Sequence, residues 1–152
     1  MHSDESFMQT IKVSKTINAP LRFVFNWCTD FREDDTLLTG SKGTRKILEK
    51  TKKRVVYAQL DPQEDGSQKV GVDYVLLKPP TSWHLEYFGE DDNEIGDYKL
   101  TSLGKNKTKL TMTFKESWKM DKVPTIEEQV QSTSRTWDQY VEALEREYAS
   151  SK

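Results

Sequence analysis

The stretch from Thr44 to Trp118 contains six strand-like runs in succession, with short turn segments and no helical period between them. The separators, such as DPQEDGS and KPPT, are rich in turn-forming residues and have the lengths that join β-hairpins. Parallel neighbours would need crossovers of a dozen or more residues, which this spacing does not allow. The sequence therefore predicts an antiparallel meander over residues 44–50, 54–60, 68–77, 82–89, 94–103 and 107–118.

The segment before the meander predicts one more strand and two short helices. Residues 7–17 alternate between apolar and polar positions, which is typical of a half-buried strand. A helix is predicted to begin near Pro20, capped by Asn18, because apolar residues then recur at three- and four-residue spacing. A second short helix is expected in the acidic segment that follows, with Leu37 and Leu38 facing inward.

The C-terminal segment has the period of one long helix. Thr125 and Glu128 have the spacing of a capping box, directly after Pro124. From Ile126 to Tyr148 the residues of one face follow each other at intervals of three or four, over roughly 35 Å at the helical rise. A helix of this length requires an equally long surface to cover.

Composition and charge exclude several classes of protein. The 23 basic and 25 acidic residues leave a net charge of −2, so no basic field would hold the chain on nucleic acid. No apolar run approaches the roughly 20 residues that span a bilayer, and the polar N-terminus is unlike a signal peptide. A cytoplasmic protein without an integral membrane segment is expected. The one cysteine, Cys28, excludes an intrachain disulfide and is predicted to be an inert thiol on the first helix.

The most distinctive local sequence is IKVSKTINAP, residues 11–20, running into VFNW, residues 24–27. With the order of strand, helix pair, six-strand meander and long helix, it resembles the START-related SRPBCC superfamily, which includes lipid-transfer domains, polyketide cyclases and plant pathogenesis-related proteins. The resemblance implies an α+β helix-grip fold: a seven-stranded curved antiparallel sheet, two short helices after the first strand, and a long C-terminal helix. It implies one such domain over residues 7–150 after a flexible N-terminus, residues 1–6.

The same resemblance implies a cavity for a hydrophobic ligand between the sheet and the terminal helix. Strand alternation and the small polar residues in the middle of that helix indicate which side chains would line it. On residues 68–77 the alternation is taken with Val70, Val72, Tyr74 and Leu76 facing inward. The candidate ligand-binding residues are Trp27, Tyr74, Trp83, Tyr87, Tyr98, Met112, Phe114, Glu116, Thr133, Ser134 and Trp137. In the alternative interpretation these aromatic residues simply fill a small core.

Glu116 is the one candidate for a catalytic acid or base. A carboxylate buried alone prefers a raised pKa or a partner cation. The alternative is that Glu116 lies near the end of its strand, where water reaches it. No nucleophile motif is present, and His2, His84 and Cys28 have no metal-ligand spacing, so neither a metal nor a cofactor is expected.

The segment from Lys42 to Arg54 holds seven basic residues and one acid, Glu49. It would suit an acidic protein partner or an anionic lipid surface; alternatively it is the solvated tip of an edge hairpin. Three functions stay open. The first is binding or transport of a small hydrophobic or aromatic ligand, lipid or polyketide-like, without covalent chemistry. The others are an enzyme of cyclase or dehydratase type, and an interaction module resembling the chaperone activators of the superfamily.

Overall fold

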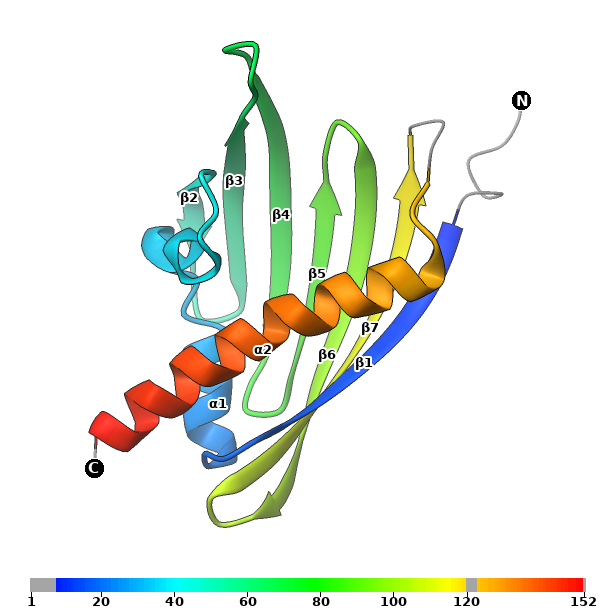
Figure 1. Cartoon of the computed structure of the whole chain (residues 1–152). Helices are drawn as coiled ribbons and strands as arrows, with labels where there is room; N and C mark the ends of the chain where they lie inside the picture. Colours follow the sequence, from blue (N-terminus) through cyan, green and yellow to red (C-terminus); the bar gives the residue numbers. More distant parts are fainter. Residues whose placement is uncertain (1–7, 120–122, 152) are drawn as a thin grey trace.

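The computed structural model describes residues 8–119 and 123–151, without the side chain of Met8, so the flexible N-terminus predicted for residues 1–6 lies outside it. The described part forms a seven-stranded antiparallel sheet in the order β1-β7-β6-β5-β4-β3-β2. The helix α2 crosses one face of the curved sheet, with α1 at one end of the sheet and η2 beside β2 (Figure 1). The elements are β1 (Met8–Ile17), α1 (Leu21–Cys28), the 3₁₀ helix η2 (Glu33–Thr39), β2 (Thr44–Lys50), β3 (Arg54–Pro62), β4 (Gln68–Lys78), β5 (Ser82–Phe88), β6 (Asp92–Gly104), β7 (Lys107–Trp118) and α2 (Ile126–Ser150).

This arrangement confirms the predicted helix-grip fold and most of its element boundaries. The bounds of β2 and β7 agree with the predicted runs, and α2 begins at Ile126, directly after Thr125, the N-cap of the predicted capping box. In that box the Glu128 backbone N–H donates to Thr125 Oγ1 at 3.1 Å, and the Thr125 N–H donates to the Glu128 carboxylate at 2.9 Å. Two of the first-turn N–H groups are thereby satisfied, which explains why the helix begins where the sequence predicts it.

The turn between β1 and α1 is held differently from the prediction. Asn18 does not cap α1; the N-cap is Pro20, without a side-chain hydrogen bond. Instead, the Asn18 backbone N–H donates to the Glu145 carboxylate of α2 at 2.7 Å. The buried Thr108 hydroxyl of β7 donates to the Ala19 carbonyl at 2.8 Å. The turn is thus fastened to both the sheet and the long helix.

The concave face of the sheet, which α2 covers, carries the core. Strand pairing aligns Val55, Val75, Leu85, Gly96 and Phe114 in one row across the sheet, and Leu77, Trp83, Tyr98, Met112 and Val13 in the next row towards α1. Of the two leucines predicted to face inward from the second helix, Leu38 lines the cavity described below, but Leu37 is 72% exposed, so that part of the prediction is wrong.

The register predicted for β4 is also wrong. The buried or half-buried inner positions are Gly71, Asp73, Val75 and Leu77, whereas Val70 and Leu76 are exposed on the convex face. The strand carries apolar residues at both parities, so its alternation does not decide the orientation. The decision comes from Gly71 and Asp73, which face Tyr87 and Gln59 across the concave side. A one-residue shift of this kind moves every side chain to the other face.

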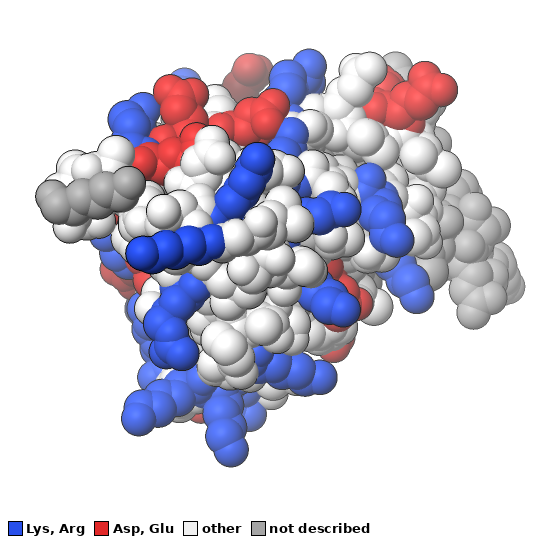
Figure 2. Space-filling model, turned by 90° about the horizontal axis from the view of Figure 1, so that it is seen from below, with Lys and Arg blue, Asp and Glu red and all other residues white. Residues whose placement is uncertain are grey.

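The outside of the molecule carries most of its charge. Seen from below, many lysine and arginine side chains project between uncharged residues, and Asp and Glu side chains gather along the upper edge of the view (Figure 2). The exposed residues of the β6–β7 hairpin include Lys99, Lys105, Lys107 and Lys109. Among the described residues no helix is both long enough and apolar enough to cross a membrane.

Candidate ligand-binding cavity

A cavity of about 450 Å³ lies between the concave face of the sheet, η2 and the middle of α2. Its volume falls in the range of roughly 300–1,000 Å³ that small-molecule sites have. The interpretation of a filled core is therefore wrong, and the predicted space beneath Trp137 is present. The lining residues are Trp27, Cys28, Phe31, Asp35, Thr36, Leu38, Thr39, Ser41, Arg45, Tyr57, Gln59, Asp73, Trp83, Leu85, Tyr87, Asp92, Glu94, Tyr98, Phe114, Ser132, Thr133, Thr136, Trp137 and Tyr140.

Aromatic rings form the part of the cavity nearest α1. Trp83 and Tyr98 stack with ring centroids 4.8 Å apart and an interplanar angle of 10°. Phe114 and Trp137 contact the Tyr98 ring from β7 and from α2, at 5.5 and 6.0 Å. Because the Trp83 and Tyr98 rings are neighbours across the β5–β6 ladder, the register itself sets their stacking.

A row of polar side chains crosses the same face farther from α1. Successive cross-strand partners in it are Tyr57, Asp73, Tyr87, Glu94, Glu116 and Gln9, one from each strand from β3 to β1. This set is called the polar row below. The Gln129 side-chain amide of α2 donates to Gln9 and so continues the row onto the helix. The cavity thus has an aromatic end and a polar end.

Asp73 is buried at the centre of β4 and is 3% exposed. Its carboxylate accepts hydrogen bonds from the side chains of Gln59 and Tyr57. Burial nevertheless raises the pKa of Asp73 to about 6, although these bonds and the charge of Arg45 act in the opposite direction. The cost of desolvating the carboxylate therefore exceeds the stabilisation that these neighbours give it.

Glu94 and Glu116 are direct cross-strand partners, and their carboxyl groups are hydrogen-bonded to each other. Such a contact requires a proton on one of the two groups. Burial, followed by the Glu116 hydrogen bond and charge, raises the pKa of Glu94 well above its usual range. Nearby, burial and Glu116 raise the pKa of Asp92 to about 6, and Lys119 opposes that rise. Glu116 is itself only 7% exposed, so the water-exposed position considered for it is wrong.

Arg45 points from β2 into the opposite side of the cavity. Its guanidinium lies over the Tyr57 ring, 4.2 Å from the centroid, and Nη1 donates to Asp35 Oδ2 at 3.0 Å. Cation–π contact and ion pair together hold it in place.

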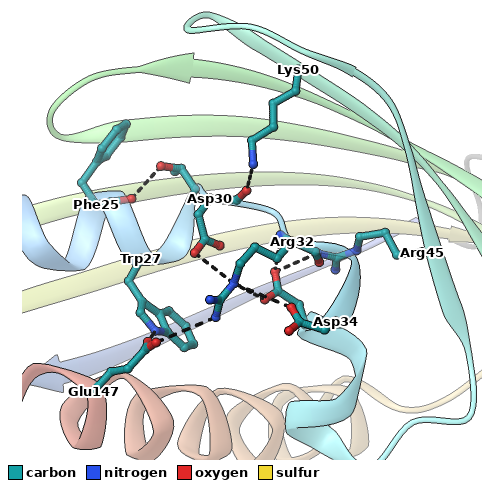
Figure 3. A network of polar contacts seen from close by, with 10 residues as sticks. Phe25, Trp27, Asp30, Arg32, Asp34, Arg45, Lys50 and Glu147 are labelled. Atoms are coloured by element: carbon teal, nitrogen blue, oxygen red, sulfur yellow. Dashed lines mark hydrogen bonds and ion pairs between the residues drawn. The ribbon is translucent and has the colours of Figure 1, made fainter. Parts of the chain in front are cut away.

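A polar network fastens η2 next to Arg45 (Figure 3). The Arg32 guanidinium lies 3.4 Å from Asp30 and 3.9 Å from Glu147 of α2, and the Trp27 indole N–H donates to Glu147. The Lys50 ammonium donates to the Asp30 carbonyl. These contacts join the segment after α1 to both α2 and β2, so the wall formed by η2 is anchored at two points.

Seven of the predicted ligand-binding residues line the cavity, and four do not. Tyr74 lies on the convex face, where Arg54 Nη1 donates to its hydroxyl at 3.0 Å, so its predicted inward position is wrong. Met112 is fully buried in the core, and Ser134 faces β1 and accepts from Lys15 Nζ at 2.7 Å. Glu116 lines a second cavity of about 440 Å³ beneath the first turns of α2. The residues that line the first cavity as predicted are Trp27, Trp83, Tyr87, Tyr98, Phe114, Thr133 and Trp137.

Most polar side chains of the cavity were not predicted from the sequence. They include Arg45, Gln59, Asp73, Glu94 and Tyr140. The available signal was the pairing of strands: placing Tyr87 inward makes its partners Asp73 and Glu94 inward as well. That inference needs the register, which the β4 alternation alone assigns incorrectly.

The structure gives little support to a cysteine nucleophile or a metal site. Cys28 lines the cavity, where burial and the charges of Asp30 and Asp35 raise the pKa of its thiol, so the nucleophilic thiolate is disfavoured. Within residues 8–119 and 123–151 no group of three or more His, Cys, Asp and Glu side chains is arranged to hold a metal ion.

The basic segment from Lys42 to Arg54 is partly occupied by contacts inside the protein. Arg45 faces the cavity, Lys50 binds the Asp30 carbonyl, and Arg54 pairs with Glu49 at 2.5 Å. A partner surface on this segment stays a prediction.

Comparison with solved structures identifies the architecture. An aromatase/cyclase from Streptomyces sp. R1128 superposes with a TM-score of 0.68 at 14% identity, covering 93% of this chain and 94% of that one. Ara h 8.0201 superposes with a TM-score of 0.70 at 14% identity, covering 94% and 99%. A START superfamily protein from Mycobacterium smegmatis superposes with a TM-score of 0.64 at 14% identity, again covering 94% and 99%.

The chain therefore has the helix-grip fold of START-related, polyketide cyclase-like proteins. No protein-family model matches its sequence, and no curated protein sequence does. At such low identity the superpositions show the fold, and the function has to be argued from the cavity.

Proposed function

We propose that this protein binds a small hydrophobic or aromatic molecule in the cavity between the sheet and α2. The observation that carries the proposal is the cavity of about 450 Å³ with aromatic rings at one end. A chain that needed only a stable core would gain by filling this space, because empty volume costs packing energy. Access would lie beside η2, which forms one wall of the cavity, whereas the turn at Lys78-Pro79-Pro80 does not line the cavity.

A neutral fluorescent probe, N-phenyl-1-naphthylamine, tests the proposal. We expect saturable binding of one probe per chain, with fluorescence enhancement. Thr136→Trp puts a large ring into the cavity and is expected to abolish binding. Gln139→Trp, on the exposed side of the same helix, is the matched control and is expected to bind as the wild type does. Absence of probe binding by the folded wild-type protein would contradict the proposal.

Native mass spectrometry of protein purified from its own host identifies the molecule itself. A co-purified small molecule should be present in the wild type and absent from Thr136→Trp. A molecule retained equally by both proteins would be bound outside the cavity.

A second candidate function, an enzyme of cyclase or dehydratase type, is favoured by the Glu94–Glu116 pair. One carboxyl group of this pair keeps a proton at neutral pH, and Glu94 lines the cavity. A positioned carboxylic acid of this kind is suited to donate a proton to a departing hydroxyl group. Incubating the co-purified molecule with wild-type and Glu94→Gln protein tests this. Loss of water seen only with the wild type supports catalysis, whereas no change with either protein contradicts it.

A further inference from the structure

The charged groups that line the cavity are not balanced. Four carboxyl side chains line it, and the one basic side chain among the described lining residues is Arg45. Arg45 is already paired with Asp35 at 3.0 Å, and its charge acts on Asp73 without forming an ion pair with it. Among the described lining residues, no cation is paired with Asp73, Asp92 or Glu94. Lining residues of α2 contribute no charge that could compensate them: Ser132, Thr133, Thr136, Trp137 and Tyr140.

The aromatic end of the cavity also has an unused polar atom. Tyr98 is 8% exposed and lines the cavity, and no described residue makes a hydrogen bond with its hydroxyl group. The hydroxyl group is therefore available to a molecule in the cavity as a hydrogen-bond partner. The faces of Trp83 and Tyr98 attract cations as well as apolar surface.

We propose that the ligand of this cavity is an aromatic molecule with a protonated amine, whose ring system lies on Trp83 and Tyr98 and whose amine binds Asp73 and Glu94. The inference rests on the proposed binding function and names the ligand class. Glu94 and Tyr98 are four residues apart on β6, roughly 13 Å along the strand. A ring system with a short amine-bearing arm spans that distance between the aromatic end and the polar row.

The protonation of the polar row supports the same ligand class. Burial raises the pKa values of Asp73 and Asp92 to about 6, and a bound cation would lower both. Amine binding near pH 6 should therefore release protons. The groups that face Asp73 are Gln59, Tyr57, Arg45 and Tyr87, and those that act on Asp92 are Glu116, Asp91 and Lys119.

Three probes of one shape and different charge test the proposal by calorimetric titration at pH 7.5. They are 2-(1-naphthyl)ethylamine, which is cationic, 2-(1-naphthyl)ethanol, which is neutral, and 1-naphthaleneacetate, which is anionic. The amine is expected to bind at least about tenfold more tightly than the alcohol, and the acetate more weakly than both. Titration at pH 6 in two buffers of different ionisation enthalpy should show proton release on amine binding.

Matched variants assign the effect to the polar row. Asp73→Asn and Glu94→Gln should each lower amine affinity about tenfold and change alcohol affinity less than about threefold. Glu86→Gln, on the convex face, should change neither. Equal affinity for amine and alcohol would overturn the amine assignment and leave the proposed binding function standing. Tightest binding of the acetate would overturn it in favour of Arg45, and binding of none of the probes would contradict the binding function itself.

Discussion

The two faces of the sheet hold their carboxyl groups in different ways. On the convex face, His84 lies between Asp97 and Glu86 at 2.7 and 3.0 Å, and Arg54 pairs with Glu49. On the concave face, Asp73 is buried and Glu94 half-buried, beside tyrosines and another carboxyl group. The convex acids are solvated and paired, whereas the concave acids are desolvated and share too few cations. Desolvated carboxyl groups without partner cations lower the stability of the fold. Such groups are expected at a binding site, where the ligand supplies the missing partner.

The largest expected difference between the faces is in aromatic packing. Trp83→Ala on the concave face removes a buried ring stacked on Tyr98 and should lower the free energy of unfolding by about 3–5 kcal/mol. Phe88→Ala, at a convex position that is 53% exposed, should change it by less than about 0.5 kcal/mol. Denaturant titration measures both. Similar losses of unfolding free energy for the two variants would show that the two faces do not differ in aromatic packing.

Replacing a concave acid should stabilise the protein. The pKa of Asp73 is about 6 in the folded protein against an ordinary value of 3.8, so wild-type stability falls as the pH rises through that interval. Asn keeps an acceptor for Gln59 and Tyr57 and does not ionise. Asp73→Asn should therefore raise the free energy of unfolding by about 1–3 kcal/mol above pH 7 and by almost nothing below pH 4. A loss of stability at pH 7.5 would show that the carboxylate is a net stabilising group.

A smaller loss is expected where the concave face needs a glycine. A Cβ at Gly71 would lie 2.3 Å from the Tyr87 hydroxyl oxygen, so Gly71→Ala has to displace that ring. We expect a cost of about 1–2 kcal/mol by thermal unfolding. In a Tyr87→Leu background the cost should fall to less than half, since the obstructing ring is gone. If Gly71→Ala has the same cost in the Tyr87→Leu background, the cause is the backbone conformation at Gly71 and not the Tyr87 ring.

The smallest effect on the free energy of unfolding should come from His84 on the convex face. There an ion pair, and not a buried acid, sets the pH dependence. Burial lowers the pKa of His84, but the hydrogen bonds that its ring N–H groups donate to Asp97 and Glu86 outweigh this effect and raise the pKa above 6.5. Protonated His84 therefore stabilises the folded protein. This contribution is fully present below pH 6.5 and is lost as the pH rises through the raised pKa. Asp97→Asn should cost about 0.2–1 kcal/mol at pH 5.5 and nothing measurable at pH 9. Thermal unfolding at the two pH values should show this sign; a larger loss at pH 9 would contradict it.

Within the candidate site, local pattern was enough where a strand has one apolar face. On β5 and β7 alternation placed Trp83, Tyr87 and Phe114 inward, as the structure does. On β4 it failed for Tyr74, because apolar residues occur at both parities and the inner acid, Asp73, was read as an outer one. On β2 the two apolar residues, Ile47 and Leu48, occupy both parities, so the inward position of Arg45 is not evident from the run itself.

By itself, the sequence determined the order of the elements, the position of the α2 capping box and the inward direction of Trp83, Tyr87 and Phe114, because these depend on periodicity and on neighbours within a few residues. Only the tertiary structure decided the polar row. Its members come from six strands and meet through pairing registers between distant segments. Burial then changes their protonation, and neither register nor burial can be read from any single run.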